Sequence, residues 1–515
     1  MAVATLPAVA QETYQDTKLV ENELNGTARY VGMGGAMEAL GADLSTMSTN
    51  PAGIGLFRSS QIAVSGGLVS QQDETTKPSF GMQGMSFNGN KTNASFDQVG
   101  LVYAMRSGYK SYLNFGFNYH KSRNFDQILT AGNNLDKASQ NKLTAVKYPY
   151  GSDYNWNGVD GLYQEAFGKW SGNQLSGMNY YNATEFLYGQ YQKGYIGEYD
   201  FNISGNINDR VFLGVTFGIH DVHYRSNSIY SEVVDVTPAN ATSQQLQANN
   251  VYEDLHITGT GYDVKFGAIF RPIDNSPFRI GVYVNTPVWY DLHNEGTVSM
   301  PNLGDFNSSI TKNDNYADYD FKVYTPWKFG VSLGHTIDKM VALGATYEYA
   351  DYAHIDNRVN DGTSSWYDGY YDNSYSDEAM NSNTKQVLKG VSTLKLGAEV
   401  KVLPQMAVRV GYNYLSPMFD KNGFRNSGIE SQGSAYATST NYTNWKCTNR
   451  WTFGLGYTAG KFFADMAYQY TQTNGEFFPF MSYYDDQNAD LDNVADKTNV
   501  SFKRNQLILT LGYKF

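Results

Sequence analysis

Large apolar residues alternate with small or polar residues in many short segments of this chain. In the last ten residues, 506–515, the large set is Leu507, Leu509, Leu511, Tyr513 and Phe515. A strand with one large apolar face and an aromatic carboxyl terminus is typical of the closing strand of a transmembrane β-barrel. The same alternation recurs at 211–219, 341–350 and 462–470, which predicts several such strands.

The opposite face of these segments carries glycine and short polar residues, for example Gly214, Gly218 and Gly344. A sandwich would need large residues on both of its inner faces. We therefore expect this second face to border a wet lumen rather than a dry core.

The whole chain contains about fourteen such segments, an even number as expected for single-chain bacterial barrels. Short turns and long loops alternate between them, which predicts periplasmic turns, extracellular loops and both termini on the periplasmic side. The predicted strands lie near 60–70, 95–106, 111–121, 194–207, 210–226, 254–271, 278–292, 318–336, 340–355, 387–402, 406–416, 449–459, 461–471 and 501–515.

Composition supports a barrel and excludes some functions. Aromatic residues make up 15% of the 515 residues, including 42 tyrosines, and tyrosine suits the girdles where a barrel crosses from lipid to water. The formal net charge of -12 argues against nucleic acid as a partner. The single cysteine, Cys447, cannot form an intramolecular disulfide.

Three regions are expected along the chain. Residues 1–10 resemble the tail of a secretory signal with cleavage after Ala10, and residues 58–515 form the barrel. Residues 11–57 contain a glycine cluster, a run at 36–47 compatible with a short helix, and the sequence Asn50-Pro51-Ala52-Gly53. This segment is either a hatch packed inside the lumen or a periplasmic segment that leads into the barrel.

These features resemble one family. The small-residue run ending in Asn50-Pro51-Ala52-Gly53, the strand count, the aromatic last strand and the paired segment 328–356 are similar to the long-chain fatty acid transporter (FadL/TodX-type) family of outer membrane proteins. The resemblance implies a hatch that includes these four residues and plugs the lumen. It also implies passive uptake of long-chain fatty acid-like or aromatic molecules, which are captured at extracellular loops and released past the hatch, sideways through the wall. Release is associated there with an inward kink in the third strand, near 113–120, where Gly116 would permit a bend.

Two further features are candidates for function. Pro287 and Pro326 lie at similar heights on neighbouring strands, where they either mark the outer rim, at which pairing ends, or weaken the wall. His120 and His220 fall on the lumen-facing parity and are candidate ligand contacts, with haem as one possible ligand.

The sequence contains no nucleophile elbow, H-E-x-x-H motif, Walker loop or glycine-rich dinucleotide turn. We therefore expect a protein that is not an enzyme and that needs no metal or cofactor. Three functions compete: a channel for hydrophobic molecules, a non-transporting shuttle or scaffold for a protein secretion system, and a porin for polar solutes. The expected location is the outer membrane of a Gram-negative bacterium, as a monomer. The expected partners are a hydrophobic ligand, outer membrane lipid and lipopolysaccharide, and the barrel assembly machinery through the strand ending at Phe515.

Overall fold

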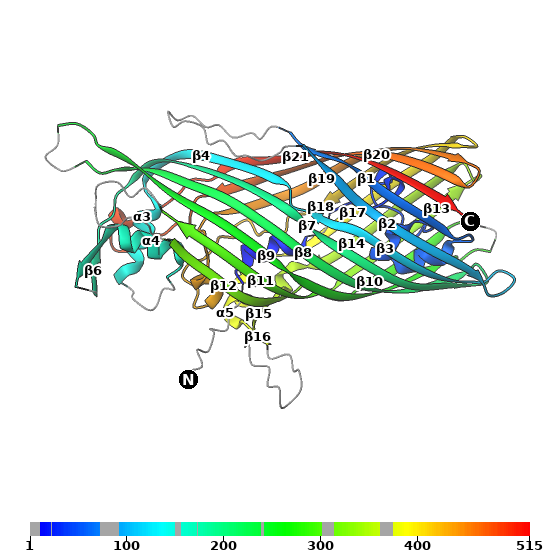
Figure 1. The fold of residues 1–515 in the computed structure, drawn as a ribbon, viewed down its shortest axis with the longest axis horizontal. Coiled ribbons are helices and arrows are strands. Elements are labelled where there is room, and N and C mark those ends of the chain that lie inside the picture. The colour runs from blue at the N-terminus through cyan, green and yellow to red at the C-terminus, as the bar shows by residue number, and fades with distance from the viewer. Residues whose placement is uncertain are drawn as a thin grey trace, which may run out of the picture.

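Fourteen antiparallel crossings close into one barrel in the computed structural model of this chain, which confirms the predicted fold class (Figure 1). The structure describes residues 11–21, 23–72, 92–149, 156–172, 174–237, 242–274, 276–300, 314–360 and 374–515. The first strand pairs with both the second strand and the last one. Closure satisfies the backbone hydrogen bonds within the sheet, as a membrane requires.

Most crossings are single strands, but two are each split into halves. The halves are β10 with β11 and β12 with β13, while β4 and β15 extend the wall at the end that carries the long loops. The strands are β1 (Gln61–Gln71), β2 (Thr92–Arg106), β3 (Tyr112–Asn124), β4 (Gln127–Ala138), β7 (Ala183–Ile207), β8 (Val211–Asp235), β9 (Leu246–Phe270), β10 (Arg279–Asn285), β11 (Trp289–Ser299), β12 (Asp314–Tyr324), β13 (Lys328–Ile337), β14 (Val341–Asp351), β15 (Asp356–Asn360), β16 (Ser374–Ser376), β17 (Gly390–Leu403), β18 (Met406–Leu415), β19 (Tyr442–Ala459), β20 (Phe462–Phe478) and β21 (Thr498–Lys514).

Side chains alternate across the wall as the sequence predicts. On β21, Leu507, Leu509 and Leu511 are exposed on the outer face, whereas Ile508 and Thr510 are fully buried on the inner face. Aromatic rings also meet across strands on the wall, as in the pairs Tyr119–Tyr199 and Tyr412–Trp451. These positions suit the aromatic girdle of a membrane barrel.

The two prolines interrupt the wall without ending it. β10 pairs with β13 on one side of Pro287 and Pro326, and β11 pairs with β12 on the other side. Between the halves, the Thr325 backbone N–H donates to the Val288 carbonyl at 3.2 Å, and the Val288 N–H donates to Thr325 Oγ1 at 2.8 Å. The expectation that pairing ends at these prolines is therefore wrong, because hydrogen bonds to the threonine side chain and backbone bridge the missing proline donors.

Residues 11–57, called the hatch from here on, run through the lumen. The predicted helix at 36–47 does not form, because Gly41 and Ala42 adopt φ values of +61° and +54° that end any helix there. The hatch elements are two helices, α1 (Thr13–Val20) and α2 (Ala28–Gly32), and two short 3-10 helices, η1 (Leu44–Ser48) and η2 (Pro51–Leu56).

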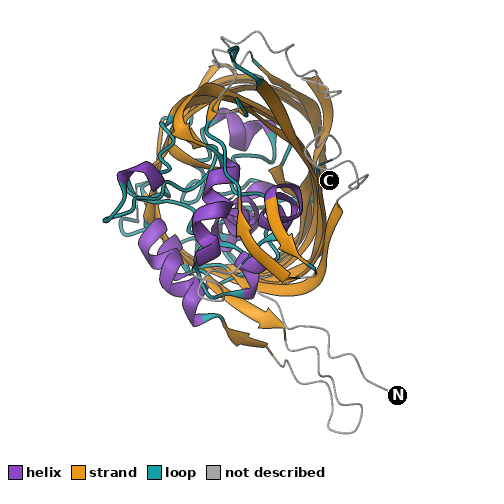
Figure 2. Ribbon diagram, turned by 90° about the vertical axis from the view of Figure 1, so that its left-hand side faces the viewer, coloured by secondary structure: helices purple, strands orange, loops and turns teal. Residues whose placement is uncertain are grey.

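Other short elements gather where the long loops lie, called the loop end from here on, opposite the short-turn end. Seen from the loop end, helices and loops lie across the mouth of the barrel (Figure 2). No described helix is long and apolar enough to cross a membrane. The loop-end elements are α3 (Gln140–Lys147), α4 (Gly158–Phe167), the hairpin β5 (Gly168–Ser171) with β6 (Gln174–Met178), η4 (Tyr352–His354), α5 (Glu378–Val387), α6 (Gln432–Ala435) and η5 (Ala489–Leu491).

The two ends of the described chain lie at different heights. Phe515 lies at the short-turn end, where its N–H donates to the Ser60 carbonyl at 2.9 Å. Gln11 lies in the loop half, where its Oε1 accepts a hydrogen bond from the Tyr319 hydroxyl at 2.7 Å. Gln11 thus lies away from the short-turn end, because the hatch climbs through the lumen, and the expectation that both termini are periplasmic stays a prediction. The predicted signal remnant, residues 1–10, falls outside the described residues.

Candidate functional site

Glycines of the barrel wall make room for the hatch backbone. Gly334, Gly344, Gly397 and Gly411 lie directly opposite one another on four neighbouring strands. A Cβ added to Gly411 would lie 2.1 Å from the Gly34 nitrogen, and one added to Gly344 would lie 1.9 Å from the Ala36 carbonyl oxygen. The expectation of a wet lumen beside these glycines is wrong at this height, because the hatch fills the space to contact distance.

The Asn50-Pro51-Ala52-Gly53 sequence lies against another part of the wall, formed by β7, β8 and β9. Asn50 is fully buried, donates from Nδ2 to the Glu38 carbonyl at 3.1 Å and accepts from the Ala52 N–H at 3.2 Å, which caps η2. The Pro51 carbonyl accepts from Ser204 Oγ at 2.7 Å. A Cβ on Gly53 would lie 2.5 Å from Thr46 Oγ1, so this position also needs a glycine. The sequence thus shapes the hatch and attaches it to the wall.

One ion-pair chain fixes helix α2 of the hatch to the wall. Arg29 pairs with Glu399 at 3.0 Å, Glu399 pairs with Arg409 at 2.6 Å, and Arg409 pairs with Asp465 at 2.5 Å. The side chains of all but Arg29 are less than one tenth exposed. Removing one member of such a chain leaves an uncompensated buried charge, which is costly.

A second ion pair fixes the middle of the hatch. Glu38 is fully buried and pairs with Lys395 Nζ at 2.9 Å. Its carboxylate also accepts from the Tyr30 hydroxyl at 3.1 Å and from Thr346 Oγ1 at 2.7 Å. The hatch segment 28–57 is therefore held by charge as well as by close packing.

A cavity of about 230 Å³ lies in the lumen beside the hatch. Its wall includes aromatic and aliphatic side chains such as Phe125, Tyr352, Met418 and Phe419. It also includes eight lysine and arginine residues against five aspartate and glutamate residues. The cavity is thus partly apolar and carries an excess of positive charge.

The wall opens between β2 and β3, next to this cavity. Their pairing ends at Gln98 and His120. In the described part of β2, residues 92–97 continue beside β1 alone, and residues 121–124 of β3 continue beside β7 alone after a bulge past Lys121. We call this unpaired stretch the wall gap.

Hydrogen bonds between strands that are not neighbours lie at the loop end of the wall gap. On β21, Arg504 Nη1 donates to the Asn124 carbonyl at 3.3 Å, so the end of β3 has turned inward toward a strand that is not its neighbour. Gln71 and the Ile128 backbone exchange two hydrogen bonds of 2.7 and 2.8 Å, which join β1 to β4. The gap is therefore a closed window rather than a split that runs to the rim.

The departure of β3 does not lie at Gly116. Gly116 pairs regularly with Val102 on one side and Asn202 on the other. A Cβ there would lie 2.4 Å from Met47 Cε of the hatch, so the glycine provides space for η1. The kink lies five residues later, at the bulge after Lys121, because bulges re-aim strands without needing glycine.

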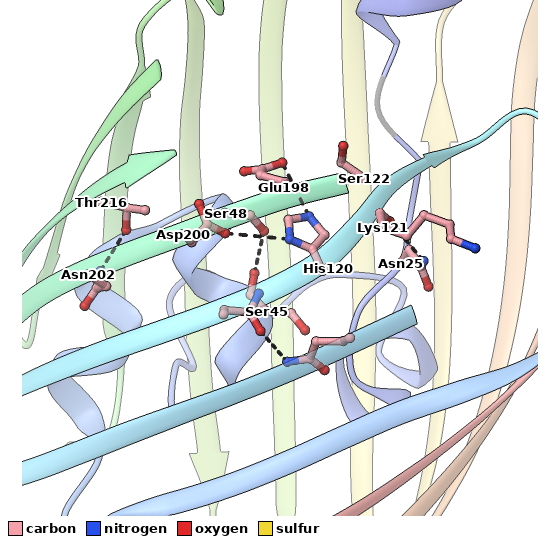
Figure 3. A network of polar contacts seen from close by, with 12 residues as sticks. Asn25, Ser45, Ser48, His120, Lys121, Ser122, Glu198, Asp200, Asn202 and Thr216 are labelled. Carbon is pink, nitrogen blue, oxygen red and sulfur yellow. Dashed lines mark hydrogen bonds and ion pairs between the residues drawn. The ribbon is translucent and has the colours of Figure 1, made fainter. Parts of the chain in front are cut away.

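His120 and His220 belong to one buried charge cluster on the inner wall. Figure 3 shows His120 beside Glu198 and Asp200. His120 Nε2 lies 3.5 Å from Glu198, and His220 Nε2 lies 3.3 Å from Asp263. Lys265 Nζ lies 2.7 to 3.2 Å from the carboxylates of Glu198, Asp200 and Asp263. His120 also lines the cavity, whereas His220 does not.

The cluster also contains two sets of three side chains whose possible ligand atoms lie within 4.8 Å of one another, His120 with Glu198 and Asp200, and Glu198 with His220 and Asp263. The Lys265 ammonium lies among all three carboxylates and supplies the cluster with a cation of its own. The sequence pattern did not single out the three acids or Lys265, although each lies on the inward-facing side of β7 or β9. Register between strands, which brings them together, could not be predicted from single segments.

Helix α1 borders the cavity and carries the buried carboxyl group of Asp16. Asp16 is fully buried, and neither of its carboxylate oxygens has a hydrogen-bond partner among the residues described. Burial therefore raises the pKa of Asp16 well above its ordinary value, and the nearby Glu12 adds to the effect. α1 also contacts the wall through the Tyr14 hydroxyl, which donates to Asn444 Oδ1 at 2.9 Å.

We expect the docking of α1 to weaken as pH rises from 5 to 7.5. The folded Asp16 binds its proton more tightly than the unfolded chain does, so the native state loses stability once the unfolded carboxyl ionises. Lys18 adds little in this window, because burial lowers its pKa only to about 8. Hydrogen exchange of residues 12–20, corrected for intrinsic rates, measures the effect. Asp16→Asn should remove the pH dependence, and an unchanged dependence in that variant would contradict this assignment.

The fold of this chain is similar to that of solved outer membrane proteins. Neither family models nor curated sequences give a match. Among solved structures, a FadL homologue of Pseudomonas aeruginosa is 12% identical, with a TM-score of 0.50 over 96% of this chain and 100% of the other. The toluene transporter TbuX of Ralstonia pickettii is 13% identical, with a TM-score of 0.50 over 96% of this chain and 99% of the other.

These likenesses cover the hatch as well as the barrel, because they extend over nearly the whole chain. They agree with the resemblance that the sequence shows around Asn50 and in the paired segment 328–356. The chain has the fold of the FadL-type outer membrane transporters.

Proposed function

We propose that this protein is an outer membrane channel for the passive uptake of hydrophobic molecules, with release sideways through the wall gap. The observation that carries the proposal is the position of the cavity, which is bordered by the hatch on one side and by residues 122–127 at the wall gap on another. The hatch blocks the way to the short-turn end at contact distance. The wall gap offers a shorter path from the cavity to the lipid.

The cavity favours an amphipathic ligand with an anionic group. Arg450 lines it and donates to Asn413 Oδ1 at 3.0 Å, and none of the described carboxylates forms an ion pair with it. Lys18 also lines it without an ion pair to any described carboxylate, and its Nζ donates to Gln15 Oε1 at 2.9 Å. A carboxylate would match these cations, while each buried methylene of its chain adds about 0.8 kcal/mol.

Replacing Arg450 by glutamine should weaken binding of a fluorescent long-chain fatty acid to the purified protein about tenfold, or about 1.4 kcal/mol. Binding of its methyl ester should not change, because the ester has no charge to lose. Arg106→Gln, an exposed arginine at the short-turn end, serves as the matched control. Equal losses for acid and ester would contradict an anionic ligand, and failure of the unmodified protein to bind either probe would contradict the proposed function.

In this proposal the short-turn end faces the periplasm and the loop end faces the outside of a Gram-negative cell. The outer face contacts lipid and lipopolysaccharide, and the strand that ends at Phe515 is the one presented to the barrel assembly machinery. The protein acts as a monomer, needs no cofactor and catalyses no reaction. Haem binding through His120 and His220 and a role as a shuttle or scaffold in protein secretion remain predictions from the sequence.

A further inference from the structure

The hatch itself occupies the wall gap from the inside. Where β2 no longer pairs with β3, the Glu23 backbone N–H donates to the Ser122 carbonyl at 3.0 Å. The Asn124 N–H donates to Glu23 Oε2 at 3.3 Å, and Arg504 pairs with the same carboxylate oxygen. Residues 23–25 thus supply the kinked end of β3 with the partners that β2 would otherwise provide.

One side chain of this segment connects the two separated strands. Asn25 Nδ2 donates to Asp97 Oδ1 on β2 at 3.1 Å. It also donates to the Lys121 carbonyl on β3 at 3.0 Å, and Figure 3 shows Asn25 beside Lys121. Asn25 Oδ1 accepts from Gln506 Nε2 on β21 at 3.2 Å. Asn25 is 8% exposed and lines the cavity, so its amide lies between the cavity and the wall gap.

Side chains also cover the wall gap nearer the lipid. The rings of Phe96 and Tyr119 stack with centroids 5.8 Å apart, and Phe96 is half exposed on the outer face. Lys121 Nζ donates to Ser95 Oγ at 2.9 Å across the same two strands. These two contacts between β2 and β3 are made by side chains, so they can separate without breaking the β-ladder.

Segment 28–57 is attached to the wall by ion pairs and close packing, whereas Asn25 is attached by hydrogen bonds alone. The later segment packs against wall glycines at contact distance and is held by the Arg29–Glu399 and Glu38–Lys395 ion pairs. At the wall gap, Asn25 of the hatch forms a direct hydrogen bond to Asp97 on β2. Local release of Asn25 therefore disturbs much less of the structure than movement of the whole hatch.

We propose that Asn25 is the gating residue of the wall gap: its amide closes the window between β2 and β3, and its release lets an amphipathic ligand pass from the cavity to the lipid. The inference rests on the proposed function. Only residues 23–25 move when the wall gap opens, and the rest of the hatch stays in place.

Two substitutions test the closing contact. Asn25→Asp keeps the size but places a carboxylate against Asp97 and removes both donated hydrogen bonds, and Asn25→Ala removes all three bonds. In cells that lack their own transporter of this type, both variants should raise the initial rate of radiolabelled oleate uptake at least twofold, with the aspartate variant the faster. Thr452→Val is the control, because it removes a hatch-to-wall hydrogen bond of 3.2 Å to the Gly32 carbonyl, away from the wall gap.

A reversible cross-link provides the opposite test. In a Cys447→Ser background, Asn25→Cys and Asp97→Cys joined by a short bis-methanethiosulfonate reagent should stop oleate uptake, and a reducing agent should restore it. Binding of the fluorescent fatty acid to the purified, cross-linked protein should persist. Uptake that continues after cross-linking, or Asn25 variants that behave like Thr452→Val, would overturn the assignment to Asn25. Absence of oleate uptake by the unmodified protein would instead overturn the proposed function.

Discussion

Replacing Lys395 by methionine loosens the middle of the hatch. The change leaves Glu38 buried without its cation, and breaking a buried pair in this way costs about 3–5 kcal/mol. The free energy of opening for hatch peptides within 28–57, measured by hydrogen exchange, should fall by that amount. The Tyr30 and Thr346 hydroxyl groups remain as neutral donors to Glu38 and cannot replace the charge.

The same strand offers a matched control. Lys401→Met makes the same chemical change at an exposed position of β17 and should leave hatch exchange unaltered. Adding Glu38→Gln to Lys395→Met should restore most of the lost stability, because the neutral amide no longer needs a cation. Hatch exchange that is unchanged in Lys395→Met would show that the ion pair does not hold the hatch.

Replacing Gly411 by alanine should open the barrel to ions. The new Cβ would lie 2.1 Å from the Gly34 nitrogen and 2.5 Å from the Met33 carbonyl carbon, so the hatch backbone has to move away from the wall. Overpacking of this kind costs about 1–3 kcal/mol even when neighbours adjust. In planar bilayers, the variant should show frequent ion-conducting openings, whereas the unmodified protein should show no steady conductance.

Gly108→Ala is the control for the alanine substitution, since its Cβ would make an ordinary contact of 3.5 Å with Ser111 in a short turn. This variant should remain closed. Steady conductance in the unmodified protein would favour the polar porin, and a closed Gly411→Ala would show that the row of glycines does not seal the hatch.

The sequence predicts the lipid-facing half of the wall because lipid imposes a strict alternation. Leu507, Leu509 and Leu511 lie outside, as their parity predicts. Strands continue beyond the prediction at the loop end, where packing against other segments buries residues of both parities, as at Phe186, Leu187 and Tyr188. β7 starts at Ala183 rather than near 194, and β4 was not predicted at all. In such stretches, burial no longer forces a period of two, so the pattern fades.

The functional features of the lumen depend on register and on contacts between distant segments. The glycines at 334, 344, 397 and 411 are visible in the sequence, but only register shows that they form one row. The kink was expected at Gly116 because glycine permits a bend, whereas a bulge after Lys121 produces it. Asn25 gave no signal, because its role arises from three strands that meet only in the folded barrel.

The central claim is that this barrel admits amphipathic molecules while its hatch stays closed to polar solutes. The direct measurement compares oleate uptake with nitrocefin entry in the same cells, which carry an intact outer membrane, a periplasmic β-lactamase and no other transporter of this type. We expect faster oleate uptake than in cells without the protein, and an unchanged rate of nitrocefin hydrolysis. Unchanged oleate uptake, or a matching rise in nitrocefin hydrolysis, would contradict it.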